Sequence, residues 1–373
     1  MDVVGLVLGG ICIFPAFIAV VNMLFWPSIR HGNAQGDVSV LIPARNEAHN
    51  IGDCLASLSA QGSNVTEILV YNDHSDDDTE TVILNYADRD PRVRVLAPVP
   101  LPPGWCGKNF ACARLAAEAT GTRLLFLDAD VRLSAGAVNA MLTEMDQRRL
   151  TFLSCWPGLV LESFFERLLM PMVNFTVFTL FPAPLSLVRA DESLGLAHGA
   201  CIMVSREAYV RLGGHESVKS AIFEDTELAR LWRRGGERGL CLDGQRYVRV
   251  RMYNSVREIW NGFNKNFFPG FQHGHSFWMF WCFHLFAFLL PFIAMPTLLV
   301  NSGWAAYAIM GVTSTLLARV AMAIRFHFPV WSALSHPIGE VFLLALGIHS
   351  WWACVSRHGV EWKGRRYHDG SGS

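Results

Sequence analysis

The sequence lacks the short patterns that mark the commonest nucleotide-dependent and hydrolytic enzymes. No G-x-G-x-x-G follows the first predicted strand, where "LIPARNE" stands instead, which argues against a dinucleotide site. The stretch Gly104–Asn109 ("GWCGKN") has neither the spacing nor the hydroxyl residue of a P-loop. A G-x-S-x-G elbow is also missing. Hydride transfer, P-loop chemistry and serine hydrolysis are therefore not expected.

The chain also lacks an excess of charge and a cysteine pattern. Its formal charge is −1 over 373 residues, so nothing indicates nucleic acid as a partner. The nine cysteines form no C-x-x-C pair and show no zinc-like spacing. We interpret them as reduced thiols of a cytosol-facing protein. The length allows one large domain or two modest ones.

Long apolar runs are present, and they lie at the two ends of the chain. Val3–Pro27 is long enough to span a membrane, which predicts an N-terminal anchor over residues 1–30. A signal peptide would instead need a basic start and a small-residue cleavage site. Arg30 and His31 follow the run, so the positive-inside rule predicts an outside N-terminus and a cytoplasmic next segment.

The C-terminal membrane region is predicted over residues 277–356. Two spans are expected near 277–300 and 304–324, and a third apolar stretch covers 329–355. This stretch contains Pro337 and Glu340, which are costly in hydrocarbon. We predict that it is re-entrant or interfacial, which leaves the basic tail 357–373 in the cytoplasm. The alternative is a third true span whose Glu340 faces protein.

The polar middle segment alternates between predicted strands and helices. Strands are expected near 38–42, 68–71, 93–96 and 124–127, and helices near 50–60, 77–87 and 109–119. This alternation predicts βαβ units with a parallel sheet, in which ligands gather at the carboxyl ends of the strands. Charged clusters stand at three of those ends: "PARNE", "NDHSDDDT" and "DAD".

Asp128 and Asp130 follow the strand predicted near 124–127. Residues i and i+2 of a strand point to the same side, so the two carboxylates are expected to address one point. Their mutual repulsion is relieved by a divalent cation, Mg²⁺ or Mn²⁺, of the kind that also holds substrate phosphates. The alternative is an ordinary surface turn, which aspartate also favours.

Four segments together resemble the inverting glycosyltransferases of family 2, which have the GT-A fold. They are "VLIPARNEAHNIGDCLASL", "VYNDHSDDDT", "LFLDAD" and "FEDTELARLWRRGG". The segments "PLPPGWCGK", "RMYNSVREIWNGFNKN" and "VEWKGRRY" are similar to the membrane-anchored branch of carotenoid (diaponeurosporenoate) and hopene-associated glycosyltransferases. The resemblance implies an α/β catalytic domain over residues 37–270, with a mixed sheet and helices on both faces.

The resemblance also implies a reaction and its partners. A UDP- or GDP-linked sugar would be transferred to a membrane lipid by a multi-pass protein of the cell (inner) membrane, with its catalytic domain in the cytoplasm. The implied residues that bind the donor are Pro43, Arg45, Asn46, Glu47, Asp73, Lys108 and Asp128. The metal would be held by Asp130 together with Asp128. For Asp76–Asp78 we prefer a role in capping the following helix.

Glu224 and Asp225 open the last of the four motifs, and the resemblance implies that Asp225 is the general base. Inverting transfer needs one base to take the proton of the attacking acceptor oxygen. Two acidic residues could instead simply cap the helix. Candidates for the acceptor site or for the charge of the leaving phosphates are His198, Arg251, Trp260, Lys265 and Arg365, with Lys108 as the preferred phosphate-binding cation.

The apolar segment 161–188 lies between the donor and base motifs and is interrupted by prolines. We predict an interfacial insertion that borders the lipid acceptor, and a buried core helix is the alternative. Two other functions were considered. A processive polysaccharide synthase would carry Q-x-x-R-W where this chain has "WNGFNKN", and a non-catalytic sugar-nucleotide binding protein would have no need for the intact acidic motifs.

Overall fold

The computed structural model describes residues 3–271, 274–296, 304–356, 360–362 and 365–367. The chain divides into two compact units. The α/β unit comprises residues 27–160 and 185–252, and the helical unit comprises residues 1–26, 161–184 and 253–373. The predicted insertion at 161–188 therefore belongs, up to residue 184, to the same unit as the apolar ends of the chain.

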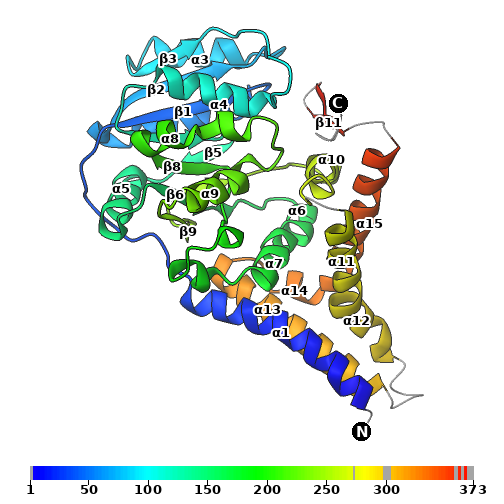
Figure 1. Cartoon of the computed structure of the whole chain (residues 1–373). Helices are drawn as coiled ribbons and strands as arrows, with labels where there is room; N and C mark the ends of the chain where they lie inside the picture. The colour runs from blue at the N-terminus through cyan, green and yellow to red at the C-terminus, as the bar shows by residue number, and fades with distance from the viewer. Residues whose placement is uncertain (1–2, 272–273, 297–303, 357–359, 363–364, 368–373) are drawn as a thin grey trace. The chain divides into compact units, whose positions relative to one another are not determined.

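The α/β unit is built on a seven-stranded sheet (Figure 1). In spatial order its strands are β3 (Val93–Leu96), β2 (Val65–Asn72), β1 (Val38–Ala44), β4 (Arg123–Leu127), β8 (Cys201–Ser205), β6 (Phe152–Trp156) and β9 (Gly239–Asp243). A small second sheet contains β5 (Val131–Leu133), β10 (Val248–Val250) and β7 (Gly158–Leu159). The four strands predicted from the sequence are the four that form one half of the large sheet.

One strand of the large sheet, β8, runs antiparallel to both of its neighbours, β4 and β6. β1 pairs in parallel with both β2 and β4, as the βαβ pattern predicts. β8 is antiparallel to β4, and Leu127 at the end of β4 is opposite Cys201 at the start of β8. The sheet is thus mixed, which brings residues just before β8 to the same edge as residues just after β4.

Helices cover both faces because the strands are buried on both sides. One face packs on α2 (Ile51–Ser59) and α5 (Ala137–Arg148), and the other on α4 (Gly107–Glu118) and α9 (Glu224–Arg234). The remaining helices of this unit are α3 (Thr79–Ala87) and α8 (Arg206–Leu212). Along β1, Val40 and Ile42 face the first core and Leu41 faces the second. This period of two fixes the register of the strand.

The helical unit contains the long apolar helices. Its elements are α1 (Val3–Phe25), α6 (Phe164–Leu169), α7 (Pro171–Leu180), α10 (Val256–Phe267), α11 (Gly274–His284), a π-helical turn (Leu285–Leu289), α12 (Leu290–Ala294), α13 (Ala305–Phe326), α14 (Trp331–Leu334) and α15 (His336–Val355), with the short strands β11 (Val360–Trp362) and β12 (Arg365–Tyr367). Within the described residues, four helical stretches are long and apolar enough to cross a membrane: Val3–Phe25, Gly274–Ala294, Ala305–Phe326 and His336–Val355.

Helices α1 and α13 lie side by side and run in the same direction (Figure 1). Ser314 Oγ donates a hydrogen bond to the Cys12 carbonyl oxygen at 3.3 Å. Further along, the Arg325 guanidinium donates to the Trp26 carbonyl oxygen at 3.1 Å. The end of α13 therefore lies level with Trp26, the last residue before the chain enters the α/β unit.

Helix α15 runs antiparallel to α11. Glu340 Oε1 is 2.8 Å from His284 Nδ1, and one turn later the Trp281 indole donates to the Leu344 carbonyl oxygen at 3.1 Å. At the far end of α15 the ring of Trp351 lies 5.3 Å from that of Trp278. The end of α15 has thus returned to the start of α11.

Glu340, the residue that argued against a span in this region, faces protein. Its side chain and those of His284 and His336 are fully buried, and Glu340 Oε2 is 3.8 Å from His336 Nε2. The cost of exposing a carboxylate to hydrocarbon therefore does not apply to α15. The π-helical turn begins directly after His284, a position at which such turns often accompany functional or strained contacts.

Helix α10 and the end of the chain pack together. The Phe268 amide donates to Ser350 Oγ at 2.9 Å, and Ser350 Oγ donates to the Asn264 carbonyl oxygen at 2.6 Å. Strand β11, which pairs with β12, also packs against α10. The tail therefore lies beside the helix that follows immediately after the α/β unit.

Candidate active site

The D-x-D pair lies at the carboxyl end of β4, as predicted, but in a different geometry. The strand ends at Leu127, and the Val131 amide closes a turn by donating to the Asp128 carbonyl oxygen at 3.1 Å. The alternation of side chains along a strand is therefore not what brings the two carboxylates together. The turn at residues 128–131 does so instead. Its start is fixed to the neighbouring chain segment, because the Asp128 amide donates to the carbonyl oxygen of Ala200, the residue before β8, at 3.0 Å.

Asp130 carries a half-buried carboxylate, one of whose oxygen atoms, Oδ1, is fully buried. No described residue hydrogen-bonds to its Oδ1 atom. Burial, followed by the charges of Asp128 and Glu47, raises the pKa of Asp130 to about 7. An electropositive ligand at this point would relieve both the repulsion and the unmet bond. Within the described residues no group of three or more His, Cys, Asp or Glu could hold a metal, so the pair supplies only part of a coordination shell.

Lys108 joins the D-x-D motif to the acidic pair that opens α9. Its Nζ atom is 2.8 Å from Asp128 Oδ1 and 2.9 Å from Glu224 Oε1. Burial opposes the positive charge, yet Asp128 and then Glu224 raise the pKa of the Lys108 ammonium well above its usual value. The sequence predicted Lys108 as a phosphate-binding cation, and the structure adds that it neutralises two carboxylates from distant parts of the chain.

Asn109 holds the two sides of this arrangement together, a role that could not be predicted from the sequence. Its side-chain amide donates to the carbonyl oxygens of Val218 at 2.8 Å and Ala221 at 2.9 Å. Those residues precede α9, so the amide ties the start of α4 to the approach to α9. An asparagine side chain beside Lys108 is an ordinary helix residue in a single sequence, and only its partners reveal this role.

Asp225 lies in the first turn of α9, and a carboxylate there is favoured by the helix dipole. Its Oδ1 atom accepts the Thr226 amide at 2.7 Å, and it also accepts the Gly199 amide. Burial and then the charge of Glu224 nevertheless raise the pKa of Asp225 to about 7. Such a value suits a group that must accept a proton near neutral pH.

Gly199 shows how closely these groups approach. A Cβ atom at this position would lie 3.2 Å from Lys108 Nζ, 3.3 Å from Asp225 Oδ2 and 3.4 Å from Glu224 Oε1. The segment before β8 thus runs past all three side chains, and glycine leaves the space in front of them free.

His198, the residue before Gly199, is held by several contacts. Its amide donates to Ser154 Oγ at 2.8 Å, the Ala200 amide donates to its Nδ1 atom at 3.3 Å, and its ring meets that of Trp156 edge-on at 5.1 Å. Burial lowers the pKa of His198 to about 4, so the imidazole is neutral at physiological pH.

The residues predicted to bind the base and ribose of a donor meet at the ends of β1 and β2. The Arg45 guanidinium donates to the Asp73 carbonyl oxygen at 2.7 Å, and the Glu47 amide donates to Thr79 Oγ1 at 2.8 Å. Asn46 has a φ of 52°, a left-handed conformation that asparagine tolerates. Pro43 lies within β1, opposite Tyr71 of β2.

Of the acidic run Asp76–Asp78, Asp77 makes contacts of the structural kind that we preferred, whereas the side chain of Asp78 at the N-cap of α3 forms no capping hydrogen bond. Asp77 accepts the amides of Ala48 and Thr79, both at 3.1 Å, and so ties the loop after β1 to the start of α3. These bonds shape the loop that carries Arg45, Asn46 and Glu47.

The remaining acceptor and phosphate candidates lie on elements other than those that carry Lys108, Asp128 and Glu224. Arg251 directly follows β10 in the α/β unit. Trp260 and Lys265 lie on α10, and Arg365 lies in β12, all in the helical unit. Trp260 donates its indole N–H to His349 Nδ1 at 3.2 Å, which binds α10 to α15. Roles of these residues towards a substrate stay predictions.

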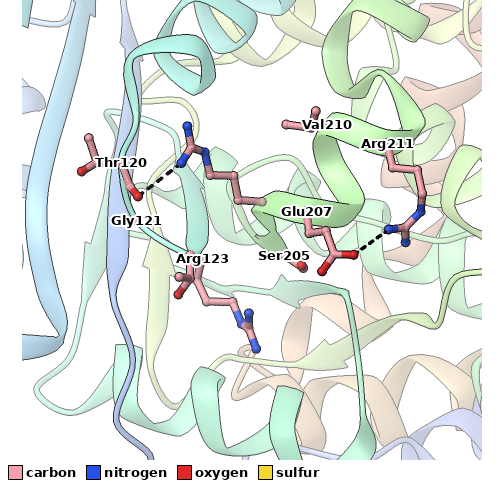
Figure 2. A pocket seen from close by; sticks show the side chains of 9 residues that line it. Thr120, Gly121, Arg123, Ser205, Glu207, Val210 and Arg211 are labelled. Atoms are coloured by element: carbon pink, nitrogen blue, oxygen red, sulfur yellow. Dashed lines mark hydrogen bonds and ion pairs between the residues drawn. The ribbon is translucent and has the colours of Figure 1, made fainter.

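A groove of 780 Å³ lies at the opposite end of β4 from Asp128 (Figure 2). Its lining includes three arginines, but each has a protein partner. Arg206 donates to the Thr120 carbonyl oxygen at 3.4 Å, and Arg211 pairs with Glu207 at 3.1 Å, as Figure 2 shows. Arg123 lies 3.7 Å from Asp146. The groove is therefore not a second candidate for the chemistry.

Residues 39–213 match the family model described as Glycosyl transferase family 2. These residues form a family 2 glycosyltransferase domain. The chain thus contains a glycosyltransferase domain, and the family and fold predicted from its motifs are confirmed for that domain.

Two proteins are similar to the chain over most of its length. The 4,4'-diaponeurosporenoate glycosyltransferase of Staphylococcus aureus (strain MRSA252) is 28% identical over 349 residues, which cover 88% of each chain. The mannosyltransferase PcManGT of Pyrobaculum calidifontis, solved in complex with GDP-Man and Mn²⁺, superposes with a TM-score of 0.54 at 16% identity. That match covers 92% of this chain and 99% of the other, and it shows the shared fold.

Proposed function

We propose that this glycosyltransferase transfers a sugar from a nucleotide-diphosphate sugar to a membrane lipid, with inversion at the anomeric carbon. The observation that carries the proposal is the convergence of Lys108, Asp128 and Glu224 within 2.9 Å contacts, with Asp225 beside them. In this proposal Lys108 is the phosphate-binding cation, Asp128 belongs to a partial metal site and Asp225 is the base, all at one sheet edge.

The donor side of the proposal rests on charge. A diphosphate requires cationic partners, and Lys108 offers an ammonium at the start of α4, where the helix dipole also favours an anion. A divalent cation, Mg²⁺ or Mn²⁺, fits the buried and unsatisfied Oδ1 atom of Asp130 together with Asp128. When bound, such an ion would stabilise the charge that develops on the leaving phosphate. The Mn²⁺ and GDP-Man in PcManGT are consistent with this reading.

We propose Asp225, and not Glu224, as the base, because Lys108 pairs with Glu224. Glu224 forms the 2.9 Å ion pair with Lys108, so its charge is already engaged. Asp225 accepts only backbone amides in the contacts described above, and its pKa of about 7 lets it exist as a carboxylate at cytoplasmic pH yet hold a proton. In the proposed reaction Asp225 takes the proton of the acceptor oxygen as that oxygen attacks the anomeric carbon.

A lipid acceptor is supported by the relative named as a diaponeurosporenoate glycosyltransferase and by the four candidate spans. Within the helical unit, α6 begins with a capping box of Ser163 and Glu166. It exposes Phe164, whose ring stacks on that of Trp331 at 5.1 Å. Exposed aromatic side chains of this kind are typical of the membrane–water interface. They support the interfacial role proposed for this insertion.

The contacts of the helical unit also support a topology in which the end of α15 lies on the same side of the membrane as the start of α11. α13 ends level with Trp26, and α15 ends beside the start of α11 with the tail against α10. Two crossings after the domain, by α11–α12 and by α13, satisfy these contacts. We therefore propose that the catalytic domain and the C-terminus are both cytoplasmic.

The activity is tested with the full chain in detergent, Mn²⁺, UDP-[¹⁴C]glucose or GDP-[¹⁴C]mannose, and a bacterial lipid extract. Transfer of label into the organic phase is expected for the wild type and should fall at least about 10²-fold in Asp225→Asn. The matched control is Glu227→Gln, which alters the same helical turn but removes only a 2.6 Å ion pair with Arg230. Label that stays in the aqueous phase with every lipid would contradict the lipid acceptor.

A further inference from the structure

His198 has one ring nitrogen whose partner is fixed and one whose partner is missing. The Ala200 amide donates to Nδ1 at 3.3 Å, so Nδ1 is the unprotonated nitrogen of a neutral imidazole. The proton of that imidazole is consequently on Nε2. Among the described residues, none forms a hydrogen bond with Nε2. The ring therefore offers one N–H donor that the protein itself does not use.

The backbone around His198 is held firmly enough to aim that donor. The His198 amide donates to Ser154 Oγ at 2.8 Å, and Ser154 Oγ donates back to the His198 carbonyl oxygen at 3.2 Å. The edge-on contact with the buried Trp156 restrains the ring. A donor held by its neighbours loses little freedom when it binds a ligand, so its hydrogen bond is more favourable.

The surroundings of His198 indicate which ligand group it would meet. The charges of Asp128 and Lys108, on the side proposed for the diphosphate, both act on the imidazole. The next residue, Gly199, lies against Asp225, the proposed base. In an inverting transfer the sugar ring lies between the leaving phosphate and the base, and His198 directly precedes Gly199, which lies against Lys108 and Asp225.

We propose that His198 donates a hydrogen bond from Nε2 to one hydroxyl oxygen of the transferred sugar and so contributes to sugar specificity. The nearby ionised carboxylates of Asp128 and Glu224 can accept hydrogen bonds but cannot donate them, so a sugar hydroxyl oxygen beside them needs a donor. The inference rests on the proposed function, because it assumes that a sugar nucleotide is the donor substrate.

The test pairs each variant with donor analogues that lack single hydroxyl groups. UDP-glucose, GDP-mannose and their 2-, 3-, 4- and 6-deoxy forms are compared for wild type, His198→Phe and His198→Gln. His198→Phe keeps a ring against Trp156 without a donor, and His198→Gln restores an N–H. Melting temperatures establish that the variants are folded.

With the better intact donor, His198→Phe is expected to lower kcat/KM about tenfold, the scale of one neutral hydrogen bond. His198→Gln should recover much of that loss. One deoxy donor should cost the wild type a similar factor and cost His198→Phe nothing further, because the bond is already absent. A purely structural role would lower kcat/KM for every donor equally, which would overturn the proposal, as would a loss that depends on the lipid acceptor instead.

The same comparison is made on binding, by displacement of a fluorescent UDP or GDP analogue in the presence of Mn²⁺. A wild type that binds these donors but transfers nothing to lipid would refute the proposed function while leaving the hydroxyl contact measurable. Equal effects of every deoxy position in wild type and His198→Phe would refute the contact while leaving the transfer activity intact. A wild type that binds neither sugar nucleotide would refute both.

Discussion

Ionisation of Asp225 should cost this enzyme stability, and its replacement by asparagine should return that stability at high pH. Burial and the charge of Glu224 raise the pKa of Asp225 from its usual value of 3.8 to about 7. The folded protein therefore binds more protons than the unfolded chain between those pH values. Stability from this uptake is present below about pH 4 and is lost as the pH rises through 7.

The size of the effect follows from the shift. About three pKa units, at 1.36 kcal/mol each, correspond to about 4 kcal/mol of destabilisation at pH 8, an upper figure because the neighbouring charges can rearrange. Asp225→Asn removes the charge, while its side-chain oxygen can still accept the Thr226 and Gly199 amides. We expect the variant to melt at a higher temperature than wild type at pH 8 and at a similar temperature at pH 4.

The assay combines thermal melting in detergent with a pH–rate profile. The kcat/KM of the wild type should rise with pH with a midpoint near 7, since the base must be unprotonated. Asp225→Asn should show low activity without that step. Glu227→Gln, in the same helical turn, should change neither measurement appreciably. If Asp225→Asn melts lower than wild type at pH 8, the carboxylate is a stabilising helix cap, and the reasoning is wrong.

Four further results are expected. Asp130→Asn should abolish the Mn²⁺-dependent part of transfer, and a chelator should do the same to wild type; full turnover in excess chelator would contradict the metal site. Lys108→Met should lower turnover about 10²-fold and move the midpoint of the pH–rate profile upward, because Lys108 lowers the pKa of Asp225; a midpoint that stays in place would show that the two charges do not interact. Glu340→Ala should destabilise the protein by about 1–3 kcal/mol by leaving the buried His284 unpaired, whereas Glu340→Gln should destabilise it less. Equal melting temperatures for wild type and both variants would show that the pair does not contribute to stability. A cysteine at position 371 should resist an impermeant thiol reagent in intact cells and react after lysis, and ready labelling of intact cells would place the tail outside.

Much of the fold could be predicted because it is encoded locally. The four strands from Val38 to Leu127 are continuous apolar runs between turn residues, and the residues that pair in the sheet lie in the ranges predicted for these strands. Helix α9 begins at Glu224, with acidic residues in its first turn and arginines in its last, as the dipole favours. The second half of the sheet could not be placed in the same way, because an antiparallel neighbour such as β8 follows from packing and not from periodicity.

The candidate site was predicted as a set of residues, but not as a geometry. The motifs indicated that Lys108, Asp128 and Asp225 belong together, while the spacing of Asp128 and Asp130 suggested an extended strand where the chain makes a turn. The role of Asn109 could not be predicted, because the carbonyl oxygens to which it donates lie near α9, far along the chain.

By itself, the sequence determined the apolar ends, the order of strands and helices in the catalytic domain, and the positions of the acidic motifs. These features depend on residue type and short-range spacing, which a single chain displays directly. Tertiary structure alone decided which charges meet: Lys108 with Asp128 and Glu224, and Glu340 with His284. A single carboxylate in an apolar run is costly to bury in hydrocarbon. Whether Glu340 faces lipid or contacts a histidine depends on how the helices pack, and this cannot be known from the sequence. Packing also distinguishes the turn at Asp128 from an ordinary surface turn, because the residues that enclose Asp130 are distant from it in the chain.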